Sequence, residues 1–296
     1  MAGVTKFAVK GGNGAAVKSD GTVLTWNNGI LNTSPNLTGV ASVGAGSSHY
    51  VALKSDGTLW AWGSNGSGQL GDGTTTDRTQ PVQVGSATDW AFVACGGSST
   101  LAIKSNGTLW AWGYGGNGVL GDSTSTNRSS PVQVGTATNW SSVSTSGSHT
   151  LGIRTDGTLW GWGNNGQGQV GDGSYNSRFS PVQIGAATNW SKVSAGGSHT
   201  VALRTNGTLW AWGNNSYGQI GDGTTTTSNA PIQIGTATNW SAVAAGDYHT
   251  VVLKTDGTVA AWGQNTSGET SVPAGLSGVT AIGAGTSSSF ALRSNP

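Results

Sequence analysis

Apolar residues occupy alternate positions in short runs along most of the chain. In the segment 51–63, Val51 and Leu53 show this spacing, and after an Asp-Gly turn Leu59 and Ala61 show it again. A period of two in such residues predicts β-strands. Asp-Gly tolerates positive φ at both central positions, which a two-residue turn between antiparallel strands requires. Residues 51–63 are therefore predicted to form a β-hairpin.

The same hairpin recurs along the chain at a fixed distance. Further copies, each fifty residues after the last, begin at Leu101, Leu151, Val201 and Val251. A shorter relative covers 15–27, and its first half returns at 290–296. Self-similarity at a fixed period is the signature of a repeat architecture.

Two further strands are predicted around each hairpin. An apolar run precedes it, with copies that begin near Val4, Val40, Trp90, Trp140, Trp190, Trp240 and Val279. A run of the type Pro-Val-Gln-Val follows it, starting at Pro81, Pro131, Pro181 and Pro231. This second run predicts a short fourth strand that begins at the proline, where no ladder donor is needed. Four antiparallel strands in each repeat predict an all-β propeller.

The first two strands occur seven times, but the third occurs only six times. We therefore predict seven blades with the seventh incomplete; the alternative is six full blades plus an extra hairpin. The whole chain, 1–296, is predicted to be a single domain, with repeats at approximately 3–38, 39–87, 88–137, 138–187, 188–237, 238–277 and 278–296.

The incomplete repeat leaves two interpretations open. Either the seventh blade is simply a strand pair, or a partner supplies the missing strands, because an unpaired edge is a template for another chain. The second interpretation predicts a docking edge with apolar contacts at Val279, Ile282, Phe290 and Leu292.

Tryptophans mark the four repeats that have long loops. These repeats carry the pairs Trp60 with Trp90, Trp110 with Trp140, Trp160 with Trp190, and Trp210 with Trp240. The two short repeats lack both members of the pair. We predict that each pair packs together beneath its long loop, and that the tryptophans as a group fill the contacts between blades.

The repeated residues also carry a family resemblance. Trp60-Ala-Trp62-Gly63 is followed by Gln69-Leu-Gly-Asp72 after a Gly-x-Gly, and a Gly-x-Ser-His-Thr segment ending at Thr200 precedes another hairpin. This pattern resembles the RCC1 (regulator of chromosome condensation) repeat family over nearly the whole chain. The resemblance implies a β-propeller, usually of seven blades.

The resemblance implies several activities. Eukaryotic members act as guanine-nucleotide exchange factors for a small GTPase through a wedge inserted between strands, and no insertion interrupts these regular repeats. A secreted bacterial member inhibits β-lactamase through aromatic loops, and its short repeats are similar to 263–273 here. The resemblance therefore leaves two functions open: an exchange factor, and a bacterial interaction or inhibitor module.

Composition favours a third class. Charged residues make up 8% of the chain and the formal net charge is +1, so no basic footprint for nucleic acid is present. No apolar run is long enough for membrane insertion, and 1–12 is predicted to be a strand instead of a Sec signal. Abundant Gly, Ser, Thr and Asn in similar repeats resemble bacteriophage appendage proteins. We predict a virion surface, fibre or decoration protein, located on the virion or outside the cell, with the cytoplasm as the alternative.

No residues in the pattern predict catalysis, a cofactor or a metal. The histidines at 49, 149, 199 and 249 share one repeat position, and ring symmetry should separate them, so we predict that each bonds neighbouring backbone. Asp72 and its copies are predicted to cap loop amides rather than to bind calcium. Cys95 is predicted to be a buried, inert thiol.

Recognition is predicted where the repeats differ, since loops carry function on a repetitive scaffold. Aromatic rings and arginines on neighbouring loops suit a protein or glycan partner, including virion neighbours. The alternative is that the arginines pin their loops and the rings cover local core. The candidate partner-binding residues are Tyr114, Tyr175, Arg178, Phe179, Tyr217, Arg78 and Arg128.

Overall fold

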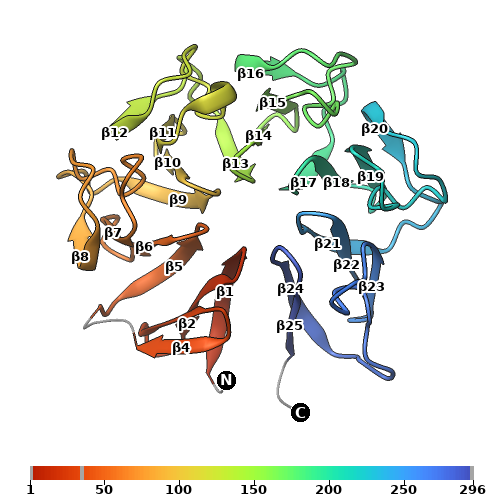
Figure 1. The fold of residues 1–296 in the computed structure, drawn as a ribbon, viewed down its shortest axis with the longest axis horizontal. Coiled ribbons are helices and arrows are strands. Elements are labelled where there is room, and N and C mark those ends of the chain that lie inside the picture. Colours follow the sequence, from red (N-terminus) through yellow and green to blue (C-terminus); the bar gives the residue numbers. More distant parts are fainter. Residues whose placement is uncertain (1–2, 34–36, 294–296) are drawn as a thin grey trace.

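The strands form sheets arranged as blades around a central axis (Figure 1). The computed structural model describes residues 3–33 and 37–293. Within these residues, five sheets have four strands, one has three and one has two. Blade 1 contains β1 (Val4–Lys10), β2 (Asn13–Lys18), β3 (Val23–Asn27) and β4 (Ile30–Thr33), in that order across the sheet.

The other blades repeat this order from the axis outward, and we number them 2 to 7 along the chain. Their strands are β5 (Val40–Ala45), β6 (His49–Lys54), β7 (Leu59–Gly63) and β8 (Arg78–Gln83); β9 (Trp90–Cys95), β10 (Ser99–Lys104), β11 (Leu109–Gly113) and β12 (Arg128–Gln133); β13 (Trp140–Thr145), β14 (His149–Arg154), β15 (Leu159–Gly163) and β16 (Arg178–Gln183); β17 (Trp190–Ala195), β18 (His199–Arg204), β19 (Leu209–Gly213) and β20 (Ser228–Gln233); β21 (Trp240–Ala245), β22 (His249–Lys254) and β23 (Val259–Gly263); β24 (Val279–Ala284) and β25 (Ser289–Arg293).

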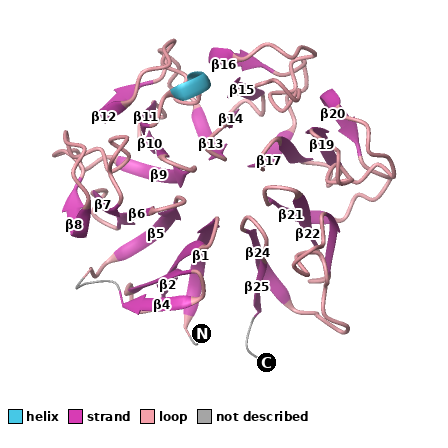
Figure 2. Cartoon of the chain, viewed as in Figure 1, coloured by secondary structure: helices cyan, strands magenta, loops and turns pink. Residues whose placement is uncertain are grey.

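This arrangement confirms the predicted all-β propeller with an incomplete seventh blade. Counting β24 and β25 as an extra hairpin beside six blades describes the same strands. Among the described residues the only helical element is the short 3-10 turn η1 (Gly116–Gly118), shown in cyan in Figure 2. None of the helical structure in residues 3–33 and 37–293 is long and apolar enough to cross a membrane.

The Asp-Gly hairpins form where predicted, but with a longer turn. Lys54 donates its N–H to the Thr58 carbonyl, so three residues form the loop, and only Gly57 among them has positive φ, at 78°. A Cβ on Gly57 would lie 2.1 Å from the Thr88 carbonyl oxygen. Asp56 accepts hydrogen bonds from the hydroxyl and N–H of Thr58 at 2.6 and 3.0 Å. The turn is thus a type I turn with a glycine bulge.

The fourth strand begins earlier than predicted. β8 starts at Arg78, so Pro81 lies inside the strand and not at its beginning. Arg78 pairs with Gly63 and Val82 with Ala61, and the register shifts between these pairs. The proline is tolerated because it lies at a bulge in an outer edge strand, where no neighbour needs its missing N–H.

The predicted tryptophan pairs are wrong in their partners. Trp90 packs edge to face on Trp110 of its own blade, with ring centroids 6.2 Å apart, and not beneath a loop with Trp60. Lys104 Nζ lies 5.0 and 5.1 Å from the two ring centroids. Because Trp90 is in register with Lys104 across the sheet, the lysine brings together two rings that the sequence places twenty residues apart.

Polar contacts join one blade to the next. The Gln69 carbonyl of blade 2 accepts hydrogen bonds from Thr100 Oγ1 at 2.9 Å and Trp112 Nε1 at 3.0 Å, both in blade 3. The indole nitrogen of the second tryptophan makes the same contact in blades 4, 5 and 6. The repeated Trp-x-Trp motif therefore packs blade against blade, as predicted for the tryptophans as a group.

Candidate functional site

The strand connections lie on two faces of the ring because antiparallel strands reverse direction at each end. One face carries the connections between first and second strands, such as 46–48, and between third and fourth strands, such as 64–77. We call it the loop face. The opposite turn face carries the Asp-Gly hairpin turns. The repeats differ most on the loop face, so the candidate site is sought there.

A buried asparagine organises each regular long loop. Asn65 is fully buried, its Nδ2 donates to Asp72 Oδ1 at 3.2 Å, and its Oδ1 accepts from the Leu70 N–H at 3.0 Å. Asn165 and Asn215 make the same contacts in blades 4 and 5. The sequence reasoning missed this residue, although its signal was present as the asparagine two positions after Trp-x-Trp-Gly.

The loop aspartates act as the sequence predicted. Asp72 Oδ1 accepts from the Thr74 N–H at 3.0 Å, and Asp72 Oδ2 pairs with Arg78 at 2.7 Å. Burial alone would raise the pKa of Asp72, but the hydrogen bonds from Thr74 and Arg78 hold it below its usual value. The carboxylate therefore stays charged and holds the loop.

The three candidate arginines are bonded within their own loops. Arg78 and Arg128 pair with Asp72 and Asp122 at 2.7 Å, and Arg178 pairs with Asp172 in the same way, each side chain being about a third exposed. These are the contacts that the loop-pinning alternative describes. Partner binding by the exposed parts of the guanidinium groups stays a prediction.

The structure brings one candidate aromatic residue together with another that the sequence reasoning missed. Tyr217 of blade 5 and Tyr248 of blade 6 pack edge to face with centroids 5.4 Å apart, and they are 53% and 44% exposed. Tyr248 stands where the other blades with this loop have serine, as at Ser48. That departure from the repeat was the signal available in the sequence.

The other candidate aromatic residues lie apart from this pair. Tyr175, in the long loop of blade 4, is 53% exposed. Phe179 on β16 is also exposed, and its ring lies against Gly118 of the neighbouring blade 3. A Cβ at Gly118 would lie 2.8 Å from Cδ1 of that ring. Tyr114 in blade 3 folds over Gly116. No single patch containing all four residues is therefore assigned.

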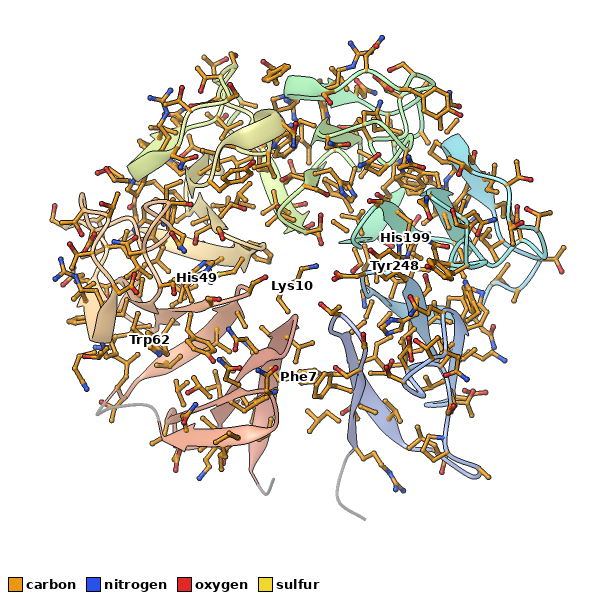
Figure 3. All side chains as sticks on the ribbon, in the orientation of Figure 1. Phe7, Lys10, His49, Trp62, His199 and Tyr248 are labelled. Atoms are coloured by element: carbon orange, nitrogen blue, oxygen red, sulfur yellow. The ribbon has the colours of Figure 1, made fainter. Side chains whose placement is uncertain are left out.

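A polar latch lies next to the tyrosine pair, at the loop-face end of the central channel. Lys10 reaches toward the centre of the ring from β1 (Figure 3), and its Nζ lies 3.4 Å from Asp247 Oδ1. Thr286 donates to Asp247 Oδ2 at 2.8 Å, and its N–H bonds the Gly11 carbonyl at 3.4 Å. The latch therefore ties blades 1, 6 and 7 together where the ring closes.

The central channel is lined by both polar and apolar groups. It measures about 270 Å³ and is lined by the innermost strand of every blade, with Val43, Ser194 and Ile282 among the lining residues. Cys95 also lines the channel and is half-buried as a residue, but its sulfur packs against Gly44 of blade 2, where a Cβ would lie 2.6 Å from Sγ, so the thiol is buried as predicted. Burial raises the pKa of Cys95 to about 12, which keeps the thiol protonated at neutral pH.

The histidines bond the neighbouring blade through a side chain, and not the backbone as predicted. His49 Nε2 lies 2.9 Å from Thr100 Oγ1, and the same contact joins His149 to Thr200 and His199 to Thr250. Thr100 gives its one hydroxyl hydrogen to the Gln69 carbonyl, so Nε2 must carry a hydrogen and donate it. Within the described residues, no three potential metal ligands lie together.

The predicted edge residues divide between two strands. Val279 and Ile282 lie on β24, the inner strand, where Val279 is buried and Ile282 lines the channel. Phe290 and Leu292 lie on β25, whose outer side has no strand among the described residues. The open edge is thus formed by β25 alone.

A family model described as RCC1-like domain matches residues 2–274. The chain belongs to the RCC1-like domain family. No curated protein matches its sequence. The repeat motifs quoted above therefore identified the family correctly, and the fold and the motifs agree.

Solved structures share this RCC1-like fold at low sequence identity. Human WBSCR16 is 20% identical, covers 98% of this chain and 86% of its own, and superposes with a TM-score of 0.84. Yeast RCC1 (Prp20), solved bound to Kap60, is 22% identical over 86% of this chain and 68% of its own, with a TM-score of 0.74. Prp20p from Saccharomyces cerevisiae, in a study of its binding to Gsp1p and histones, is 20% identical over 82% and 66%, with a TM-score of 0.72. These likenesses show that this chain shares the fold of these proteins.

Proposed function

We propose that this RCC1-like propeller is a non-enzymatic binding module that holds a protein partner on its loop face at Tyr217 and Tyr248. The observation that carries the proposal is the contact between these two exposed rings, which come from different blades. Exposed aromatic pairs in contact are preferred anchors at interfaces, because they bury a large area at little cost in side-chain entropy.

The surroundings of the pair support a polar rim around an aromatic anchor. Asn214 Nδ2, three residues before Tyr217, donates to Gln167 Oε1 at 3.0 Å, and Asp247, which directly precedes Tyr248, pairs with Lys10 of β1. A partner would therefore meet two rings surrounded by amides and one ion pair. This combination is typical of protein interfaces.

The chain itself supplies matched variants for testing the pair. Tyr217→Ser and Tyr248→Ser introduce the residues that blade 2 has at Ser67 and Ser48. We expect the double variant to retain the melting temperature within about 2 °C and to bind the partner at least about tenfold more weakly, or about 1.4 kcal/mol. The measurement is affinity capture from the native source, with the captured protein quantified by mass spectrometry.

The control is Tyr175→Thr, which introduces the residue of Thr75 and leaves the tyrosine pair intact. Loss of the partner in this control, with full capture by the double variant, would place the site on the outer loop of blade 4 and contradict the proposal. Capture of a glycan by the tyrosine pair in place of a protein would contradict the partner class.

We further propose that the partner is a virion component and that this chain is a surface, fibre or decoration protein. Support comes from the scarcity of charge, at 8% of residues, from the 51 glycines, and from the near-identical repeats. Fractionation of the native source by particle size should recover the chain with virion-sized particles. Recovery in a small soluble complex would favour a cellular interaction or inhibitor module, and accelerated nucleotide release from a co-purifying GTPase would favour an exchange factor.

A further inference from the structure

The second strand of blade 7 is open along one side. In blade 2, Lys54 bonds Thr58 and Ser48 bonds Ser64, so alternate residues of β6 direct their N–H and C=O groups toward β7. The register of β25 against β24 places Ser289 and Ala291 at the corresponding positions. Their backbone groups therefore point to the side of β25 on which the described chain has no strand.

The neighbouring junctions show what covers this position elsewhere in the ring. Between blades 3 and 4, Leu109 and Ala111 of the third strand are fully buried against the next blade. Between blades 7 and 1 the corresponding space is a pocket of about 320 Å³, lined on one side by Phe290 and Leu292. Trp26 of blade 1 lines its other side and packs on Phe290 with centroids 6.1 Å apart.

The side of β25 toward blade 6 also borders a pocket. Among the described residues of β25, only Ser289 is tied to blade 6 there, by a hydrogen bond from its Oγ to the Glu269 carbonyl at 2.6 Å. A second pocket, of about 440 Å³, is lined by Ala291 together with Val259 and Ala261 of β23. These two residues of β23 are only half-buried, whereas their counterparts Leu209 and Ala211 in blade 5 are fully buried. Apolar side chains on both sides of β25 thus lack the cover that a third strand gives in the other blades.

The edge also lacks the feature that protects the outer strands of the complete blades. β8, β12, β16 and β20 each contain a proline and a register shift, which prevent pairing with a further strand. β25 has the sequence Ser-Phe-Ala-Leu-Arg, with no proline and a regular register from Ala281 to Ala284 against β24. It is therefore competent to accept a strand.

We propose that β25 binds an extended segment of another protein, which adds antiparallel to it as the third strand of blade 7. The internal repeat defines the chemistry of this segment. At the equivalent place blades 2, 3 and 5 have Leu-Trp-Ala-Trp-Gly, in which the leucine and alanine face the next blade and the tryptophans face the preceding one. The guest strand has the same alternation, with medium and small apolar residues toward Trp26 and aromatic residues toward Val259.

This pattern argues against a second copy of β25 as the occupant. A paired copy would direct Phe290 and Leu292, two large side chains, toward blade 1, and the small residues Ser289 and Ala291 toward the pocket of about 440 Å³ beside blade 6. The larger pocket would then receive the smaller side chains. A guest with aromatic residues on that side fills both pockets.

The probe is a fluorescent peptide with the sequence of residues 205–214, which carries the blade 5 hairpin turn and third strand. Binding is followed by fluorescence anisotropy. Ala291→Pro removes an outward N–H that β24 does not use, and Ala291→Val keeps that N–H and places its methyl groups in the pocket. We expect the proline variant to weaken binding at least tenfold and the valine variant to change it less than threefold, with both variants melting like the parent.

Further measurements decide the result. Bound peptide should slow hydrogen exchange at the amides of Ser289 and Ala291, and a peptide with aspartate in place of its leucine and alanine should not bind. Absence of binding, or equal binding by the proline variant, would overturn the proposal. A homodimer that Ala291→Pro dissociates would assign the edge to a second copy instead. Tyr217→Ser with Tyr248→Ser should leave peptide affinity unchanged, which separates this result from the loop-face site.

Discussion

Buried histidines should make this propeller sensitive to mild acid. His49, His149 and His199 are fully buried between blades, and each donates from Nε2 to a threonine hydroxyl. Burial lowers the pKa of His149 and His199 to about 3 and that of His49 to about 4, from 6.5. The folded state therefore keeps all three rings neutral, while the unfolded chain protonates them.

The sign and size of the effect follow from linkage. The folded pKa values lie below the unfolded value, so the unfolded chain binds protons that the folded chain does not. The free energy of unfolding is therefore unaffected by these rings above pH 6.5 and decreases as the pH falls toward 4. At pH 5 each ring costs about 2 kcal/mol, since each pKa unit corresponds to about 1.4 kcal/mol. The three rings together cost about 6 kcal/mol, comparable with the whole stability of many domains.

The assay is the free energy of unfolding in urea, measured between pH 7 and 5. We expect a slope near pH 5 of about 4 kcal/mol per pH unit, which corresponds to three protons. The loop carboxylates do not interfere, since the pKa of Asp72 and its copies lies below 3.8.

The variant His149→Asn introduces the residue that blade 1 has at Asn13 and serves as the test of assignment. It should reduce the slope by one proton, or about 1.4 kcal/mol per pH unit, whatever its effect on stability at pH 7. A slope that His149→Asn leaves unchanged, or a parent slope below about 1.4 kcal/mol per pH unit, would refute the reasoning.

Two further variants test the contacts within and between blades. Thr200→Val leaves His149 Nε2–H without its acceptor, while the Gln169 carbonyl keeps its bond to Trp212 at 3.0 Å. Thr200→Val should lower the free energy of unfolding measured by calorimetry by about 1–3 kcal/mol. Thr200→Ser, which keeps the hydroxyl, should restore most of this loss. An unchanged melting temperature in Thr200→Val would contradict the assigned hydrogen bond. Arg128→Met leaves the buried carboxylate of Asp122, which is 6% exposed, without its cation. It should cost about 1–3 kcal/mol and accelerate amide exchange in the loop 114–127, and unchanged exchange would show that the arginine does not hold the loop.

Much of the fold was predictable because its signals are local. The alternation of Val51, Leu53, Leu59 and Ala61 predicted the hairpin, and the copies of that hairpin predicted the blades. Details that depend on neighbours were wrong. The turn at Gly57 is one residue longer than Asp-Gly suggested, since the same dipeptide is compatible with both loop lengths.

The candidate site was less predictable than the fold. Tyr217 was named from its departure from the repeat, but Tyr248 was missed because it lies in a different connection of another blade. The candidate arginines were correctly seen to recur, yet their pairing with the aspartates six positions earlier became visible only in the structure. Spacing in sequence does not show which of several loop groups an arginine reaches.

The sequence by itself determined the strands, their order within a blade and the missing third strand of blade 7. These features follow from interactions among residues a few positions apart, namely side-chain alternation and turn chemistry. Only the tertiary structure decided which blade surfaces meet. His149 bonds Thr200 and Tyr217 packs on Tyr248 because the ring turns each blade's surface toward the next, which places residues 51 and 31 positions apart in contact. The same ring geometry sets the open side of β25 between blades 6 and 1, where its two apolar pockets lie.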